Sequence, residues 1–326
     1  MPATESHMRR AMVTGSSGFI GGHLCARLAP ADSFRGIDLA PPPGPVEYHH
    51  IGADIRCPET LRDIVARCGR PDGVFHLAAS AEVLTPWSGL PPLLSSNMEG
   101  TYNVLQVLDP KLVVFASSSS VYGNAGSSPV DPRHAAVRPL CLYAMSKLTA
   151  EMIVRDWARD AGGAAVIFRF GNVIGPGCRG LIPYLAGHAL RYPEGGVPAR
   201  LRGYGRLVRD YVPVDYVVRV LLAATLDWEP RSLVTLNLGA GRAVTNREVA
   251  EIVQQAVRGL GLQLDVSYDD APGAGEADEV VLDMEETVKL FGIVPPSPDE
   301  VRESIAGAAV EFLRGARVSS PVESHA

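Results

Sequence analysis

The sequence lacks several features that would define other classes of protein. Its 326 residues hold no run of about 18 apolar residues, the length that a membrane-spanning helix needs. Its polar N-terminus holds no apolar signal segment. The 30 lysines and arginines are outnumbered by 36 aspartates and glutamates, giving a net charge of −6 with no basic excess for nucleic acid. We therefore expect a cytoplasmic protein with no membrane or nucleic-acid partner.

Paired cysteines are also missing. The five cysteines form no CxxC motif and no metal-like spacing with histidine, which is typical of reduced thiols in the cytoplasm. His49-His50 is expected in a loop without a partner ligand, and His76 in a strand, bonded to backbone groups. The sequence predicts no metal site.

What the chain does contain is an alternation of short apolar runs and helical patterns. Helices are expected at 58–68, 95–108 and 142–160, between strands at 10–14, 33–39, 73–77, 112–116 and 165–170. Such alternation is typical of βαβ units. We expect an α/β protein with a Rossmann-type doubly wound parallel sheet.

The composition changes after Gly171, where Pro, Gly and Arg punctuate residues 175–213. A helix at 215–226, a strand at 234–238 and a helix at 246–259 follow. We expect a Rossmann domain of residues 8–172 plus about 208–240, a smaller α/β domain of 173–207 and 241–316, and a flexible tail at 317–326.

Three glycines, Gly15, Gly18 and Gly21, lie between the first strand and the first helix. Glycines at such a turn let the backbone approach a pyrophosphate, and the helix N-terminus offers free N–H groups. Asp38 ends the second strand, 23 positions after Gly15. A carboxylate there accepts from ribose hydroxyls and repels a 2′-phosphate, which favours NAD over NADP.

Two further motifs carry candidate catalytic groups. Tyr143 and Lys147 share one helix face, where an ammonium group can stabilise a phenolate and make it a usable base. The serines of 117–120 follow an apolar strand, and the strand ends of a doubly wound sheet form the ligand crevice.

Together these motifs resemble the extended short-chain dehydrogenase/reductase family, in its NAD-dependent nucleotide-sugar epimerase/dehydratase branch. The resemblance covers about residues 10–295. It rests on TGSSGFIGG, Asp38, Asp54-Ile55, HLAA from His76, NMEGT from Asn97, SSSSVYG, YAMSK, RFGNVIGP from Arg169 and RDYVPVD from Arg209.

The resemblance implies a role for each matching residue. It implies that NAD is held by Gly15, Gly18, Phe19, Ile20, Gly21, Asp38, Asp54, Ile55, Leu77, Ala78 and Ala79, with Tyr143 and Lys147. Tyr143 would be the base, assisted by Lys147 and Ser118. Ser118, Ser119, Asn172 and Arg209 would bind a nucleotide-diphosphate sugar. The family also implies a homodimer through the helices at 95–108 and 142–160.

The expected activity is a nucleotide-sugar 4-epimerase, working by transient oxidation at C4 and return of the hydride. Ser119 and Ser120 stand where relatives that lose water or carbon dioxide carry acidic residues. A 4,6- or 5,6-dehydratase and a 4-keto-sugar reductase stay open as alternatives, as does a non-catalytic dinucleotide-binding module.

Some positions depart from the family pattern. Gly203-Tyr204-Gly205 replaces a glycine-acid-glycine, and Ala271-Pro272-Gly273 lacks a late arginine. Arg200, Arg202, Arg206 and Arg209 could rebuild an anion site or lie on the surface. The substrate's nucleotide and sugar therefore stay open.

Overall fold

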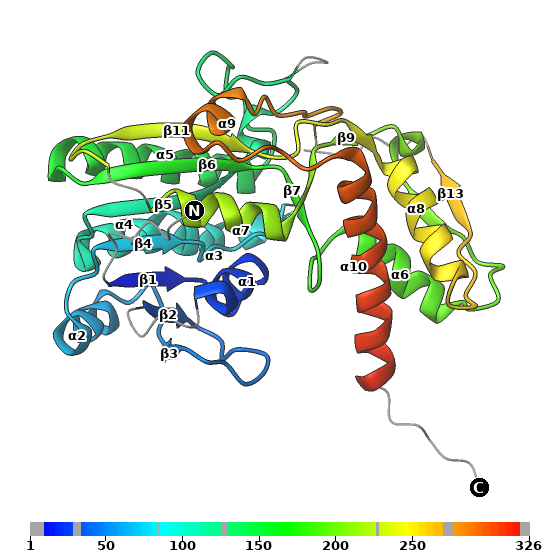
Figure 1. Cartoon of the computed structure of the whole chain (residues 1–326), viewed down its shortest axis with the longest axis horizontal. Coiled ribbons are helices and arrows are strands. Elements are labelled where there is room, and N and C mark those ends of the chain that lie inside the picture. The colour runs from blue at the N-terminus through cyan, green and yellow to red at the C-terminus, as the bar shows by residue number, and fades with distance from the viewer. Residues whose placement is uncertain are drawn as a thin grey trace, which may run out of the picture.

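The computed structural model describes residues 10–28, 34–83, 85–125, 129–225, 228–269 and 277–319. Figure 1 shows two adjoining parts, a twisted sheet with its helices and a smaller group of helices and short strands. The long helix α10 (Pro298–Ser319) belongs to the smaller part and lies on its side that faces the sheet.

The larger part is built on a seven-stranded sheet in which all neighbours are parallel. Its strands, in spatial order, are β11 (Leu233–Leu238), β6 (Ala164–Phe170), β5 (Leu112–Ser118), β4 (Gly73–His76), β1 (Ala11–Thr14), β2 (Phe34–Asp38) and β3 (His49–Gly52). The order reverses between β1 and β4, and such a reversal opens a ligand crevice at the carboxyl ends of the strands. The predicted doubly wound sheet is confirmed.

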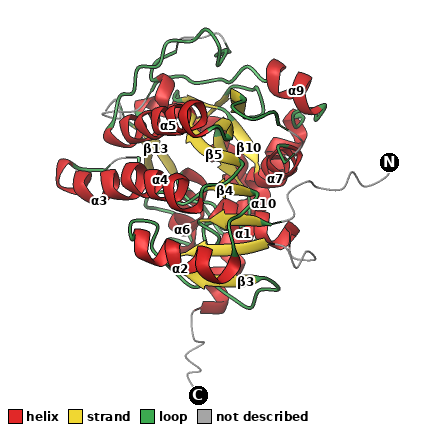
Figure 2. Ribbon diagram, turned by 90° about the vertical axis from the view of Figure 1, so that its left-hand side faces the viewer, coloured by secondary structure: helices red, strands yellow, loops and turns green. Residues whose placement is uncertain are grey.

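Helices cover both faces of this sheet (Figure 2). One layer holds α2 (Pro58–Cys68), α5 (Leu142–Ala161) and a continuous helical stretch from α3 (Leu90–Leu94) through α4 (Gly100–Asn103) to Leu108. The other holds α1 (Phe19–Leu28), α7 (Val214–Ala223) and α9 (Glu285–Phe291).

Successive side chains of β5 pack against the two helix layers on opposite faces of the sheet. Val113 and Phe115 pack with Ala150 and Val154 of α5. Val114 belongs to the core on the opposite face, with α1 and α7. Because successive side chains of a strand point to opposite faces, a strand buried on both sides is apolar throughout.

The smaller part has its own apolar core, formed by α6 (Leu181–Arg191), α8 (Asn246–Arg258) and α10. Three strand pairs accompany it, β7 (Asn172–Ile174) with β10 (Tyr211–Pro213), β8 (Ala199–Leu201) with β13 (Val266–Tyr268), and β9 (Val208–Arg209) with β12 (Val244–Thr245). The short 3-10 turns are Trp87–Gly89, Ser119–Tyr122 and Gly203–Gly205.

Several details differ from the sequence predictions. The stretch 175–213, for which no helix was predicted, contains α6, and the helix predicted at 95–108 is the end of a stretch that includes α3. His49 and His50 begin the edge strand β3 and do not lie in a loop. The helix predicted at 215–226 is Val214–Ala223. Ala271-Pro272-Gly273 and the tail from 320 lie outside the described residues. No helix in the described ranges is both long and apolar enough to span a membrane.

Candidate active site

At two positions of the turn between β1 and α1, only glycine fits. Gly15 has φ +76°, and a Cβ there would lie 2.7 Å from the Ala78 nitrogen. A Cβ on Gly21 would lie 1.9 Å from the Gly15 carbonyl oxygen. This packing brings the N-terminus of α1, at Phe19 and Ile20, to the carboxyl edge of the sheet. Free N–H groups of a first helical turn bind anions such as a pyrophosphate.

The Asp38 carboxylate fixes this turn from the neighbouring strand. It accepts hydrogen bonds from the backbone N–H groups of Ser17 (3.0 Å) and Ala40 (2.9 Å). A carboxylate has about four acceptor positions, so two remain for the hydroxyl groups of a ligand.

The next two strand ends carry the other predicted cofactor contacts. Asp54 follows β3 and is paired with Arg56 at 2.6 Å, and this guanidinium holds the pKa of the carboxyl below its usual value. Asn103 donates to the Ile55 carbonyl oxygen at 3.1 Å. Leu77, Ala78 and Ala79 follow β4, and the backbone of Leu77 and Ala78 passes beside Gly15. The carboxylates of Asp38 and Asp54 and the glycine turn lie at one edge of the sheet, as binding of an adenosine diphosphate requires.

His76 differs from its prediction, because it bonds threonine hydroxyls and not backbone groups. Its Nδ1 lies 2.7 Å from the Thr14 Oγ1, and its Nε2 lies 2.9 Å from the Thr101 Oγ1. Thr101 donates its own hydrogen to the Asn97 carbonyl oxygen, so Nε2 carries the ring proton. Burial, aided by the charge of Lys147, lowers the pKa of His76 to about 3 and keeps the ring neutral.

Asn97 joins the loop after β4 to the helix that carries Tyr143. Its side chain exchanges two hydrogen bonds with the Ser80 backbone, at 2.8 and 3.0 Å. It also donates to the Ser146 Oγ at 2.9 Å. The loop beside the glycine turn and the start of α5 are therefore held together.

Ser118, Tyr143 and Lys147 meet at the carboxyl end of β5. Lys147 donates to the Ala116 carbonyl oxygen at 2.8 Å, and burial lowers its pKa to about 8. Burial raises the pKa of Tyr143 to about 12, and a hydrogen bond with Ser118 opposes that rise. The predicted triplet lies together, and its phenol stays protonated near neutral pH unless further positive charge or hydrogen bonding stabilises the phenolate.

Sequence reasoning missed a buried ion pair behind this triplet. Glu151, fully buried, pairs with Arg169 of β6 at 2.7 Å and accepts from the Ser117 hydroxyl at 2.6 Å. The Arg169 guanidinium lies 4.8 Å from the centre of the Tyr122 ring. Glu151 stands four positions after Lys147 on the same helix face, a spacing that could have shown it.

The predicted substrate residues line one cavity of about 140 Å³. Ser118 and Ser119 enter it from the end of β5, and Asn172 and Arg209 from the start of β7 and the end of β9. Of the four arginines at 200, 202, 206 and 209, only Arg209 lines the cavity.

Asp210 supports the side of this cavity that Asn172 and Arg209 form. Its buried carboxylate accepts from the N–H groups of Ala240 (2.6 Å), Gly241 (2.9 Å) and Leu282 (3.1 Å). Its own carbonyl oxygen accepts from the Asn172 N–H at 2.7 Å. A carboxylate among backbone N–H groups is a strong tether, and it was not singled out from the sequence.

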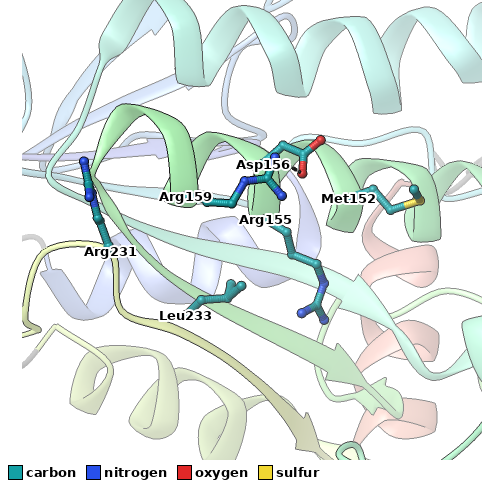
Figure 3. Close-up of a pocket in the computed structure, with 6 residues that line it drawn as sticks. All are labelled: Met152, Arg155, Asp156, Arg159, Arg231 and Leu233. Carbon is teal, nitrogen blue, oxygen red and sulfur yellow. Dashed lines mark ion pairs between the residues drawn. The ribbon is translucent and has the colours of Figure 1, made fainter.

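Other cavities lie elsewhere. One of about 830 Å³ adjoins the outer side of the glycine turn and the 42–48 loop. Another, of about 600 Å³, lies on the outer face of α5 near the start of β11. Figure 3 shows that its three guanidinium groups point in different directions, with Arg159 turned to Asp156. This arrangement does not gather charge around one ligand.

Comparison with known proteins agrees with this geometry. The chain is 27% identical over 238 residues to a probable UDP-glucuronate 4-epimerase of Rhizobium meliloti, covering 65% of this chain and 67% of that protein. It is 30% identical over 272 residues to a GDP-6-deoxy-D-mannose reductase of Pseudomonas aeruginosa, covering 81% and 84%.

Solved structures show the same fold over almost the whole chain. The structure of MoeE5 in complex with UDP-glucuronic acid and NAD superposes with a TM-score of 0.81 at 30% identity, covering 94% of this chain and 99% of that one. UDP-glucose 4-epimerase of Thermotoga maritima, with UDP-glucose, gives a TM-score of 0.81 at 26% identity over the same shares.

Residues 11–239 match the sequence pattern of one protein family. This range includes the sheet, the glycine turn, the Ser118–Tyr143–Lys147 triplet and Arg209. With the cradle at Gly15 and Asp38 also fitting a dinucleotide, the chain belongs to the NAD dependent epimerase/dehydratase family, and NAD is its cofactor.

Proposed function

We propose that the protein is an NAD-dependent nucleotide-sugar 4-epimerase. The observation that carries this proposal is the single cavity in which Ser118 and Ser119 face Asn172 and Arg209, next to Tyr143. Residues predicted from distant parts of the sequence line one cavity at the carboxyl end of β5, on the sheet edge where doubly wound folds bind ligands, and this supports the proposal.

NAD, when bound, supplies a hydride acceptor and donor for one carbon of the sugar. Arg209 would pair with the diphosphate, since a guanidinium can bond two oxygens at once, and Asn172 would donate to the same group. Ser118 would hold the oxygen at C4. Tyr143 would take the hydroxyl proton from that oxygen and give it back after the sugar has turned over.

The lining of the cavity favours epimerisation over the loss of water. Elimination needs an acid and a base beside the sugar, and Ser119 and Ser120 offer neither near neutral pH. Asp210 is the one carboxylate among the described residues that line this cavity, and backbone N–H groups occupy it. The relatives named 4-epimerases support the same choice.

A 4-keto-sugar reductase is the second candidate, because the relative that is 30% identical is a GDP-6-deoxy-D-mannose reductase. Such an enzyme could use the same triplet but would consume NADH or NADPH in proportion to product. The two candidates therefore differ in a quantity that can be measured directly.

The test is a proton NMR time course of the purified protein with NAD and a panel of UDP-, dTDP-, GDP- and CDP-sugars, uronic acids included. An epimerase brings either isomer to one fixed ratio without net NADH. Product that appears only with added NADH or NADPH would replace the proposal by the reductase, and product lacking water or carbon dioxide would replace it by an eliminating enzyme.

We propose further that two copies associate through α5 and the helical stretch before β5. Four large apolar side chains on these helices face outward, Leu94, Tyr102, Met145 and Met152, with exposed fractions of 38%, 54%, 52% and 59%. Light scattering should give the mass of a dimer, and Met152→Glu should give that of a monomer; a monomeric wild type would refute the association.

We also propose a domain organisation and a cellular compartment. The separate core of α6, α8 and α10 supports a substrate domain of about 173–207 and 241–316. All five cysteines are free thiols, which supports the cytoplasm as the compartment.

A further inference from the structure

Asn237 carries a fully buried amide near the end of β11, and three hydrogen bonds fix its side chain. Its Nδ2 donates to the backbone carbonyl oxygens of Val130 at 2.6 Å and Asp283 at 3.0 Å. Because carbonyl oxygens can only accept, the nitrogen of the amide must face them, and its oxygen faces the Tyr122 hydroxyl at 2.6 Å. Tyr122 therefore donates this bond, and both hydrogens and the oxygen of the amide are engaged.

The contact with Tyr122 connects Asn237 to the side of the cavity that holds the base. Tyr122 is the last residue of the short turn that follows β5, and it is buried. The Arg169 guanidinium lies 4.8 Å from the centre of its ring. Arg169 pairs at 2.7 Å with Glu151 of α5, the helix that also carries Tyr143. The oxygen of the Asn237 amide is thus bonded to a group that packs against the elements around Tyr143.

The two carbonyl oxygens connect Asn237 to the opposite wall of the cavity. Val130 is joined to the segment 280–283 by backbone hydrogen bonds. Val280 of this segment lines the cavity, and the Leu282 N–H donates to the Asp210 carboxylate at 3.1 Å. Through Asp210 the segment is tied to the part of the cavity that is expected to hold the diphosphate.

We propose that Asn237 is a positioning residue, which holds the cavity wall at 280–283 in a fixed place relative to the turn and helix beside Tyr143. The described residues that line the cavity do not include Asn237, so it acts through the groups that it holds. The spacing of the two walls sets where a bound sugar carbon lies relative to the base. The inference rests on the proposed function only for the reaction in which this spacing is used.

The first experiment compares the wild type with Asn237→Leu, a side chain of similar size that makes no hydrogen bond. A small misplacement of reacting groups costs up to about 100-fold in rate, so we expect kcat for the active nucleotide sugar to fall about 10–100-fold. Calorimetry with the matching UDP, dTDP, GDP or CDP should give a Kd within about twofold of wild type, since Asn172 and Arg209 are intact. A raised KM with unchanged kcat would overturn the inference, because Asn237 would then support binding alone.

The second experiment, amide hydrogen exchange of the NAD-bound protein, needs no substrate. Asn237→Leu should speed exchange in peptides that cover 130 and 280–283 by about fivefold or more, the effect of one lost hydrogen bond. Peptides of α6, α8 and α10 should keep the wild-type rate. Unchanged exchange at 280–283, or faster exchange throughout the protein, would contradict a positioning role.

Two further variants sharpen the result. Gln254→Leu is the matched control, because this amide also donates to a backbone carbonyl oxygen, that of Leu264 at 2.9 Å, and does not line the cavity. It should leave kcat and the exchange at 280–283 unchanged.

Tyr122→Phe removes only the bond to the Asn237 amide oxygen and keeps both bonds to the backbone. It should lower kcat about fivefold with an unchanged Kd, and it decides the inference if Asn237→Leu does not fold. Wild-type kcat in Tyr122→Phe would show that the two walls do not depend on this link. If wild type converts no nucleotide sugar, the proposed function fails, while hydrogen exchange still decides whether Asn237 holds the wall.

Discussion

Two sides of the cavity at Ser118 are held in place in different ways. On the α5 side, which carries Tyr143 and Lys147, charged side chains are buried between helix and sheet, as in the Glu151–Arg169 pair. On the β7–β9 side, which carries Asn172 and Arg209, the Asp210 carboxylate accepts hydrogen bonds from three backbone N–H groups. Lys147 is 4% exposed, whereas Asn172 lies at the surface.

The difference matches what each side has to do. A base must keep one position relative to the reacting carbon, and buried charges with fixed partners give that precision at a cost in stability. A surface that admits a large anionic ligand must stay open to solvent, and main-chain tethers can hold its frame while its side chains remain accessible. Four substitutions test this contrast.

The largest effect should come from the base. We expect Tyr143→Phe to lower kcat about 10³-fold, because general acid–base catalysis contributes about 10²–10⁴-fold. Calorimetric binding of the nucleotide sugar should stay within about twofold of wild type, since the β7–β9 side is intact. A variant that turned over at nearly the wild-type rate would remove Tyr143 from the chemistry.

The second effect concerns stability on the α5 side. Glu151→Ala leaves the Arg169 guanidinium buried without its partner, which should lower the free energy of unfolding by about 3–5 kcal/mol in urea titrations. Adding Arg169→Met should restore much of the loss. The exposed pair Arg62–Glu59 is the matched control, and Glu59→Ala should leave the transition in place. A single variant as stable as wild type would contradict the buried-charge account.

The third effect separates binding from chemistry on the β7–β9 side. Arg209→Ala should raise the Kd for a nucleotide sugar about 10–100-fold, the worth of a hydrogen-bonded charge, with kcat nearly unchanged at saturation. Arg200→Ala is the control, because Arg200 is exposed and outside the cavity. Equal losses in both variants would mean that general positive charge attracts the ligand and that no defined contact exists.

The same contrast explains which features could be predicted from the sequence. The buried strands, the glycine turn and the Tyr143–Lys147 spacing are local patterns, so the sheet and its cofactor edge followed from them. β3 was missed because His49–Gly52 is a partly exposed edge strand with no apolar run. The Glu151–Arg169 and Asp210–Leu282 contacts join residues 18 and 72 positions apart, so the partner of each carboxylate is known only once the chain has folded.

The smallest effect tests whether the buried side chains of α5 alone stabilise the start of this helix. Cys141 is the N-cap of α5, with the extended backbone that a cap requires but no capping hydrogen bond from its side chain. Cys141→Ser should place a hydroxyl that accepts a first-turn N–H, raising the free energy of unfolding by about 1 kcal/mol and Tm by about 2 °C. Cys141→Ala cannot cap and should not stabilise. Equal Tm values for serine and alanine would show that the buried contacts of Lys147 and Glu151 already fix the start of the helix.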